Sequence, residues 1–230
     1  MVRTPSAGKL ASIADAATEE FGRVGYRRAR TADVARIAGI SSGSLFTYAQ
    51  SKEALFHLVF VNGFGNLDDA SLPLATPAAG ETLALIEKGL RRIPAPNLRA
   101  ALAIDEPADV RSELRGIVEE RYGILERNWR VLRVIERCAV DIPELEAFYF
   151  GNLRVRYFRE FAHYFERRGS AGYLRTMPDT AAATRVVSEA ITWFAWHRHE
   201  GRDARLFDDR VARETVVAFV CAALVPEVST

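Results

Sequence analysis

The stretch VARIAGISSGSLFTYAQSKEAL, residues 34–55, contains two short helix-like runs separated by Gly-Ile-Ser-Ser at 39–42. A short helix, a tight turn with a glycine and a second short helix form a helix-turn-helix, which presents its second helix to the major groove of DNA. Gly39 has the backbone freedom that the turn requires, and Gly43 keeps the second helix narrow where it would meet a groove wall. The stretch therefore predicts a DNA-binding element.

Hydrophobic periodicity predicts further helices on both sides of this element. Apolar residues recur at steps of three and four over residues 7–24, which is typical of an amphipathic helix. The first helix of the motif opens at Arg30 or Thr31, and Ser51 is typical of the N-cap of a helix that follows the motif. The residues expected on the inner faces are Leu10, Ile13, Ala17, Phe21, Val34, Ile37, Ala38, Leu45, Tyr48, Ala49, Leu55, Phe56, Val59 and Phe60.

The rest of the chain also has a helical pattern, without strand-like alternation or a repeat of fixed period. Residues 66–80 are polar, small and proline-bearing, and we expect a hinge there. Beyond them the expected helices are 81–93, 97–104, 107–138, 143–168, 178–199 and 210–225. An alternative for the third of these is a break near Trp129. The sequence thus predicts an all-α fold.

Charge is unevenly distributed along a chain whose composition is that of a globular protein. The 230 residues are 49% hydrophobic and 27% charged, which excludes disordered and collagen-like chains. Residues 1–52 hold eight Lys and Arg against four acidic residues, so this end carries +4 within a chain of net charge +1. A basic end joined to a mildly acidic remainder indicates that the N-terminus meets a polyanion.

The cysteines and the N-terminus favour a cytoplasmic protein. Cys138 and Cys221 are too few for a disulfide framework, and the first residues lack the apolar region of a secretory signal. No apolar run approaches the roughly 18 residues that a membrane span needs, so we expect no membrane partner. Both thiols are expected to be buried and structural rather than oxidant-sensing.

The ordered motifs of the N-terminal part resemble the TetR family of transcriptional regulators. The resemblance covers residues 7–60, about a quarter of the chain. It implies an N-terminal three-helix helix-turn-helix DNA-binding domain, residues 1–52, and a C-terminal helical effector-binding and dimerisation domain, residues 53–230. The motifs that carry it are Phe21, Gly25-Tyr26, Asp33-Val34-Ala35, Ala38-Gly39-Ile40-Ser41, Gly43-Ser44-Leu45 and Ser51-Lys52-Glu53-Ala54-Leu55.

The resemblance also implies which residues contact DNA. Ser42, Gly43 and Phe46 would approach base edges. The residues that would hold the phosphate backbone are Thr31, Ser44, Thr47, Tyr48 and Lys52. The family usually has Tyr where this chain has Phe46, a basic residue where it has Ser42 and an aromatic where it has Ala49. At Phe46 only apolar contact remains, for instance with a thymine methyl, so the operator sequence is harder to infer.

The function that the resemblance implies is a ligand-responsive transcriptional regulator without catalytic residues. We expect a repressor that binds a palindromic double-stranded DNA operator as a homodimer and is released by a small, largely apolar effector molecule. The last two helices would pair across the dimer. The apolar rows expected at that interface are Ala183, Val187, Ala190, Ile191, Val216, Val217, Val220 and Leu224.

The effector would bind between helices of the aromatic-rich body. The candidate ligand residues are Trp129, Phe150, Tyr157 and Trp193. Ordinary core packing is the alternative for each ring, although so many large rings in one helical domain can leave an apolar cavity.

Two other classes of function stay open: a helical-bundle enzyme, and an interaction module without DNA binding. Bundle enzymes with metals use inward-facing carboxylates with Glu-x-x-His spacing, and Glu144, Glu146 and Glu189 have no His at that distance. His197 and His199 point apart on a helix, and no acid or Cys completes a ligand set, so we expect no metal and no cofactor.

Overall fold

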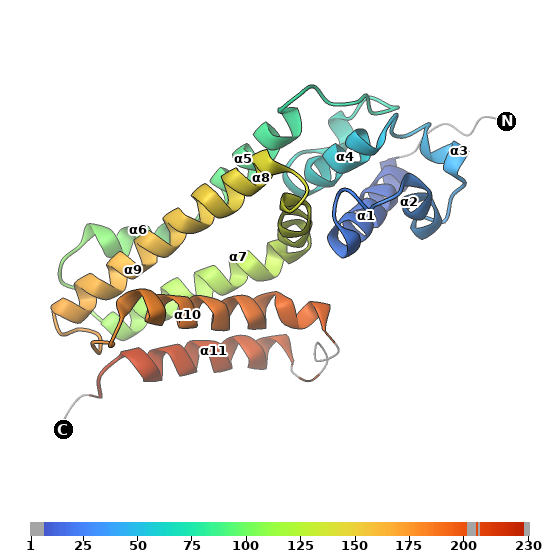
Figure 1. The fold of residues 1–230 in the computed structure, drawn as a ribbon. Helices are drawn as coiled ribbons and strands as arrows, with labels where there is room; N and C mark the ends of the chain where they lie inside the picture. Colours follow the sequence, from blue (N-terminus) through green and yellow to red (C-terminus); the bar gives the residue numbers. More distant parts are fainter. Residues whose placement is uncertain (1–6, 202–205, 207, 228–230) are drawn as a thin grey trace. The chain divides into compact units, whose positions relative to one another are not determined.

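The computed structural model describes residues 7–201, 206 and 208–227, and the chain packs as two compact units. Unit 1 comprises Met1–Ile93 and Arg130–Asn152, and unit 2 comprises Pro94–Trp129 and Leu153–Thr230. Every regular element among the described residues is helical (Figure 1), as the sequence predicts. No described helix is long and apolar enough to cross a membrane.

Each unit is built from its own set of helices, and α7 (Val110–Ala139) contributes residues to both. The other helices of unit 1 are α1 (Ala7–Val24), α2 (Thr31–Ile37), α3 (Ser42–Leu45), α4 (Lys52–Phe64), the 3-10 turn η1 (Leu67–Asp69), α5 (Glu81–Arg92) and α8 (Pro143–Phe148). Those of unit 2 are α6 (Pro96–Ala103), α9 (Val155–Ser170), α10 (Thr180–Ala195), the 3-10 turn η3 (His197–Glu200) and α11 (Asp209–Leu224). A π-helical segment, η2 (Tyr149–Arg154), leads from α8 into α9.

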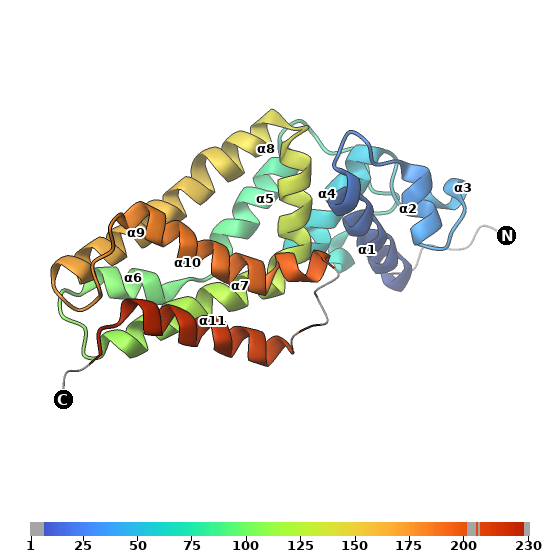
Figure 2. The ribbon, with the colours of Figure 1, turned by 60° about the horizontal axis from the view of Figure 1, so that its bottom comes forward.

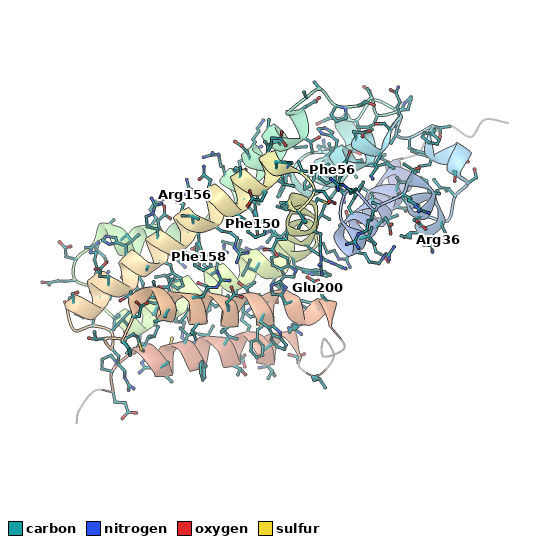
Figure 3. The ribbon with its side chains drawn as sticks, viewed as in Figure 1. Arg36, Phe56, Phe150, Arg156, Phe158 and Glu200 are labelled. Carbon is teal, nitrogen blue, oxygen red and sulfur yellow. The ribbon has the colours of Figure 1, made fainter. Side chains whose placement is uncertain are left out.

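The core of unit 1 forms where α1 meets α4. The face predicted for α1 is buried, since Leu10, Ile13, Ala17 and Phe21 are at most 1% exposed. The ring of Phe56 on α4 (Figure 3) lies 5.2 Å from that of Phe21 and 5.0 Å from that of Phe60, both edge to face. Such aromatic pairs add to the free energy of burial, so they fix the angle at which α4 crosses α1.

The short helix α2 differs in detail from its prediction. It begins at Thr31, and Arg30 is its N-cap residue but makes no side-chain capping bond. Its buried residues are Val34, which was predicted, and Ala35, which was not. Ile37 and Ala38 are only half-buried, because the helix is too short to turn them fully toward α1.

Three of the helix predictions for the remainder need correction. The alternative break near Trp129 is wrong, because α7 runs on without interruption, although the boundary between the two units falls there. The single helix expected over 143–168 is divided by the π-helical segment η2. The helix expected over 178–199 ends at Ala195 and continues as a 3-10 turn.

The hinge expected over residues 66–80 is in part a fixed segment, which we call the strap. Leu74 forms a parallel bridge with Ala49, directly after the predicted DNA-reading helix. Its N–H donates to the carbonyl oxygen of Tyr48 at 2.8 Å, and its own carbonyl accepts from Gln50 N at 3.0 Å. Thr76 Oγ1 donates to Ser51 Oγ at 2.8 Å. The prediction of a hinge is therefore wrong for the middle of this segment.

In unit 2, α10 lies between α9 and α11 in both views (Figures 1 and 2). A buried arginine, Arg168 on α9, donates through Nε and Nη2 to the two carboxylate oxygens of Glu113, both at 2.8 Å. It also donates to the carbonyl oxygens of Ala101 and Asp105, each at 2.8 Å. Because a planar guanidinium satisfies a carboxylate and two carbonyls together, Arg168 fixes the end of α6 and the start of α7 to α9.

The prediction named the wrong residues for the apolar dimer interface. The larger residues of both rows are buried within the single chain, and Ala183 and Ala190 are half-buried. The buried ones are Val187, Ile191, Val216, Val217, Val220 and Leu224. They fill the space between α10 and the neighbouring helices of unit 2, so they belong to the core. The exposed large apolar residues of the same two helices are Val186, Trp193, Val211 and Phe219.

Candidate nucleic-acid interface

The turn before α3 has the conformation that the sequence predicts. Gly39 has φ of +65°, in the left-handed region that side chains with a Cβ rarely adopt. Ser41 then caps α3, because its Oγ accepts from Ser44 N at 3.1 Å and lies 2.8 Å from Ser44 Oγ. A side-chain oxygen at an N-cap satisfies an amide that the first turn leaves free. The structure therefore uses the Ser41 hydroxyl inside the protein.

Two buried residues anchor α3 and the turn after it. Leu45 has no exposed surface and Ala49 is 1% exposed, as predicted for the inner face. Tyr48 is also largely buried, at 8% exposed, so little of its side chain is open to a phosphate. These anchors determine which side of α3 turns outward.

The outward side carries the residues predicted to meet DNA. Ser42, Gly43, Ser44 and Thr47 are exposed, and Phe46 keeps 49% of its surface exposed. Thr47 Oγ1 donates to the carbonyl oxygen of Ser44 at 2.7 Å, which closes the turn after α3. The result is a small polar face with one exposed ring, held on a rigid base.

Lys52 lies at the start of α4 and is already engaged within the protein. Its Nζ donates to the carbonyl oxygen of Arg27 at 3.1 Å and lies 4.8 Å from the centroid of the Tyr26 ring. The side chain is half-buried, so its position is defined rather than left to solvent. Thr31, the other predicted phosphate contact outside α3, is the first residue of α2 and is half-buried.

The loop that receives Lys52 is held to α4 by a second contact. Tyr26 Oη donates to Glu53 Oε1 at 3.0 Å, and burial raises the pKa of Tyr26 above its usual value. The pKa of Glu53 is lowered, first by its own backbone N–H at the start of α4 and then by Tyr26. The neutral phenol and the ionised carboxylate are thus the stable forms of this pair.

Basic residues beyond Lys52 also lie on this part of unit 1, and the motif analysis did not single them out. Lys9 Nζ donates to the carbonyl oxygen of Ala38 at 2.8 Å and ties α1 to the end of α2. Arg30 is exposed just before α2, and Arg36 on α2 (Figure 3) is exposed and pairs with Asp33 at 3.1 Å. Only the net charge of the N-terminal part indicated this group.

The four predicted ligand residues are divided between the two units. Phe150 belongs to unit 1, whereas Trp129, Tyr157 and Trp193 belong to unit 2. Trp129 stacks on the His199 ring at 5.5 Å, and Trp193 is 38% exposed on α10. A pocket described in unit 2 lies elsewhere, among the ends of α9 and α11 and the start of α10. None of the four lines that pocket.

The cysteines are placed as the sequence predicts. Cys138 and Cys221 are free and buried, and burial raises the pKa of Cys138 to about 12. Thiols with raised pKa values hold little thiolate at neutral pH, so a structural role follows. Within the described ranges, no group of three or more His, Cys, Asp or Glu side chains could hold a metal ion.

Comparison with known proteins supports a DNA-reading assignment for the N-terminal part. Residues 13–59 match the family model described as bacterial regulatory proteins of the tetR family. The matched range contains α2, α3 and the start of α4, which are the elements whose geometry is given above. The curated proteins contain no match to the chain.

Solved structures share the fold over nearly the whole chain. A transcriptional regulator from Saccharomonospora viridis, crystallised with choline, has a TM-score of 0.55 and 16% identity, covering 96% of this chain and 100% of that chain. AibR, crystallised with isovaleryl coenzyme A and operator DNA, has a TM-score of 0.53 and 16% identity, covering 94% and 99%. A protein from Mesorhizobium loti described as a TetR-family regulator has a TM-score of 0.51 and 17% identity, covering 97% and 100%. At these identities the likeness concerns the fold.

Proposed function

We propose that this chain is a regulator of the TetR family, whose model its residues 13–59 match, and that it is a repressor that binds a palindromic operator as a dimer and is released by a small molecule. The observation that carries this proposal is the exposed face of α3, with Ser42, Gly43 and Phe46 turned outward from buried Leu45 and Ala49. The family match over residues 13–59 supports a transcription factor rather than an enzyme or a helical module without DNA binding.

The proposed division of labour on DNA follows from exposure and chemistry. Ser42, Gly43 and Phe46 face base edges, because they lie on the open side of the reading helix. The residues that hold phosphates are Thr31, Ser44, Thr47, Tyr48 and Lys52. Phosphate contacts position the protein and carry no sequence information, whereas contacts to base edges select the operator.

The proposed dimer uses the outer faces of α10 and α11. Val186, Trp193, Val211 and Phe219 are exposed on these two helices, and exposed apolar groups of this kind mark interaction surfaces. A twofold arrangement would place two reading helices about 34 Å apart, which matches successive major grooves. The reading domain is residues 1–52 and the effector and dimerisation domain is residues 53–230, in a cytoplasmic protein.

The proposed effector acts through differential binding. Proteins of this fold include one crystallised with choline and one with isovaleryl coenzyme A and operator DNA, which supports a small-molecule effector here. A ligand moves the DNA-binding equilibrium only if it prefers one conformation, with a typical coupling of about 1–3 kcal/mol. Reciprocity then requires operator DNA to change effector affinity by the same factor.

The test is selection of DNA fragments by the purified full-length protein, followed by sequencing of the retained fragments. We expect a palindromic motif with half-sites about one helical turn apart. Gly43→Glu places a carboxylate on the outward face of α3, where the added Cβ meets only Ser41 Oγ, at 4.0 Å, and should abolish retention. Ala147→Glu adds the same charge at an exposed site on α8 and should leave retention unchanged. Equal retention by both variants would refute this interface.

A further inference from the structure

The loop between α1 and α2, residues 25–30, is held within unit 1 by a residue from the other end of the sequence. Asp141, which follows α7, accepts a hydrogen bond from the backbone N–H of Arg27 at 2.7 Å, 114 residues away in the chain. The Asp141 carboxylate also lies 4.0 Å from the Arg27 guanidinium, whose side chain is 83% exposed. An exposed ion pair contributes little, so the charge-assisted bond to the backbone is the main contact.

Gly25 shows how closely the end of α7 approaches this loop. Its φ is +81°, and a Cβ added there would lie 3.1 Å from the carbonyl oxygen of Arg137 and 3.2 Å from Asp141 Oδ2. Both distances are shorter than ordinary van der Waals contact. The loop therefore lies directly against the end of α7, with no space for a side chain between them.

Asp141 is itself held in place on both sides. Its N–H donates to the carbonyl oxygen of Cys138 at 3.0 Å. Cys138 and Ala139 before it are at most 1% exposed, and Leu145 on α8 after it is 2% exposed. Because the backbone on either side is anchored in the core of unit 1, the carboxylate is an acceptor at a fixed place.

The backbone of Arg27 is bonded on its other side to the start of α4. Its carbonyl oxygen accepts from Lys52 Nζ at 3.1 Å, and the same Nζ lies 4.8 Å from the centroid of the Tyr26 ring. The Tyr26 hydroxyl in turn donates to Glu53 at 3.0 Å. Asp141 therefore fixes the residue whose carbonyl oxygen fixes the Lys52 ammonium.

We propose that Asp141 is a positioning residue for DNA binding, which holds the Arg27 backbone so that Lys52 is presented to a phosphate. This inference rests on the proposed function, which assigns Lys52 to the phosphate backbone. Asp141 lies far outside residues 13–59, which match the family model. Its negative charge by itself repels DNA, so a charge effect and a positioning effect predict opposite results when the carboxylate is removed.

The first test measures the affinity of the full-length protein for its selected operator and for unrelated DNA. Asp141→Ala removes the acceptor and should weaken binding to both by about fivefold, although it also removes a negative charge. Asp141→Asn keeps an oxygen that accepts from the Arg27 N–H and should bind within about twofold of the unchanged protein. Glu144→Ala removes the same charge from an exposed site on α8 and should not weaken binding. Unchanged or tighter binding by Asp141→Ala, or an equal loss in Asp141→Asn, would overturn the proposal.

A double-mutant cycle tests whether Asp141 acts through Lys52. In a protein that already carries Lys52→Ala, the further change Asp141→Ala should cost almost no affinity, because the group that it positions is gone. Additive losses would show that Asp141 acts by another route and would overturn the proposal. Failure of the unchanged protein to select any DNA would instead refute the proposed function.

Hydrogen exchange without DNA measures the Asp141 contact separately from DNA binding. Asp141→Ala should speed the exchange of the Arg27 amide and its neighbours in the loop, while exchange within α1 and α7 stays the same. Asp141→Asn should keep the protection of that amide. Unchanged exchange at Arg27, or faster exchange throughout unit 1, would refute a positioning role, the second because it would show a general loss of stability.

Discussion

At the scale of single residues, Lys52 has both a structural role and a proposed DNA-binding role at the start of α4. Its Nζ is held by the carbonyl of Arg27 and by the face of the Tyr26 ring, so the ammonium has a fixed position. Its charge also adds to the positive end of the α4 dipole, where an anion is stabilised. The same contact that orders the loop before α2 therefore presents a cation to a phosphate.

Lys52→Ala should weaken binding to all DNA sequences alike and reduce the slope of log affinity against log salt by about one. The reason is that a phosphate contact carries no sequence information. The measurement is affinity for the operator and for unrelated DNA across a salt series, with Lys52→Arg as the control that keeps the charge. A changed preferred site with unchanged affinity would show that Lys52 has been given the wrong role.

Phe46→Ala should change base preference at one operator position by about 1–3 kcal/mol and leave the protein as stable as before. Phe46 is 49% exposed in the free protein, so its removal costs little folding free energy. Leu45→Ala is the contrasting change, because it empties a buried site and should cost about 2–5 kcal/mol. Binding to an operator library and urea unfolding of both variants would check this, and a uniform loss of affinity for Phe46→Ala would contradict it.

The stability of the protein should fall as pH drops below about 6.5, in part because of His57. Burial lowers the pKa of His57 in the folded state, with the charge of Glu81 opposing, and its Nδ1 lies 3.0 Å from Thr82 Oγ1. A depressed histidine pKa means that stability is full above the unfolded value and is lost as pH falls through the folded value.

His57→Gln should make the decline shallower, as measured by denaturant unfolding at about pH 7.5 and 5. Burial lowers the pKa of His199 as well, so part of the slope should remain in that variant. An unchanged slope in His57→Gln would show that this imidazole does not contribute.

At the scale of helices, close packing between α4 and α5 depends on one glycine. A Cβ added at Gly89 would overlap the ring of Phe64, which stacks on Phe60 at 6.4 Å. Gly89→Ala should therefore destabilise the protein by about 1–3 kcal/mol, although alanine favours a helix more than glycine does. Gly169→Ala on α9 meets nothing within 4 Å and should be neutral or stabilising. Equal unfolding midpoints for the two variants would contradict this packing.

The helices themselves were largely predictable, because the apolar period and the caps are local. Ser51 is the N-cap of α4, with Oγ accepting from Ala54 N at 3.1 Å, and Gly39 adopts the left-handed conformation. The strap was not predictable, since its contacts are hydrogen bonds, most of them between backbone groups, to residues far back in the chain. Leu74 lies in a polar, proline-bearing stretch, and nothing in that composition indicates a partner.

The two candidate sites also differ in how far the sequence predicts them. The outward face of α3 follows from local spacing, because Leu45 and Ala49 point inward and their neighbours therefore point outward. The ligand residues were chosen by aromatic density, which does not distinguish core from cavity.

At the scale of the whole molecule, the proposed assembly is carried by the outer faces of α10 and α11. Phe219 is 66% exposed, whereas the rows that periodicity suggested are buried in the chain's own core. Periodicity identifies an apolar face but cannot say whether the same chain or a second copy covers it.

Phe219→Asp should convert a dimer to a monomer, because a carboxylate would be desolvated at the interface. Light scattering and sedimentation at micromolar concentration give the mass, and Ala147→Asp on exposed α8 is the control that should remain dimeric. The monomeric variant should also bind a half-site far more weakly than the dimer binds a palindrome. A monomer mass for the unchanged protein would remove the proposed interface altogether.

The strap has a consequence for anyone exchanging reading modules between regulators. A transplant cut after residue 52 would leave behind Leu74 and Thr76, and with them the hydrogen bonds to Tyr48, Gln50 and Ser51. The grafted helix α3 would then contact DNA without the hydrogen bonds that hold the residues directly after it. A module that keeps these hydrogen bonds has to extend through residue 80. A hybrid protein without this segment would keep the DNA-contacting residues of α3 but lose the contacts that hold the residues after it in place.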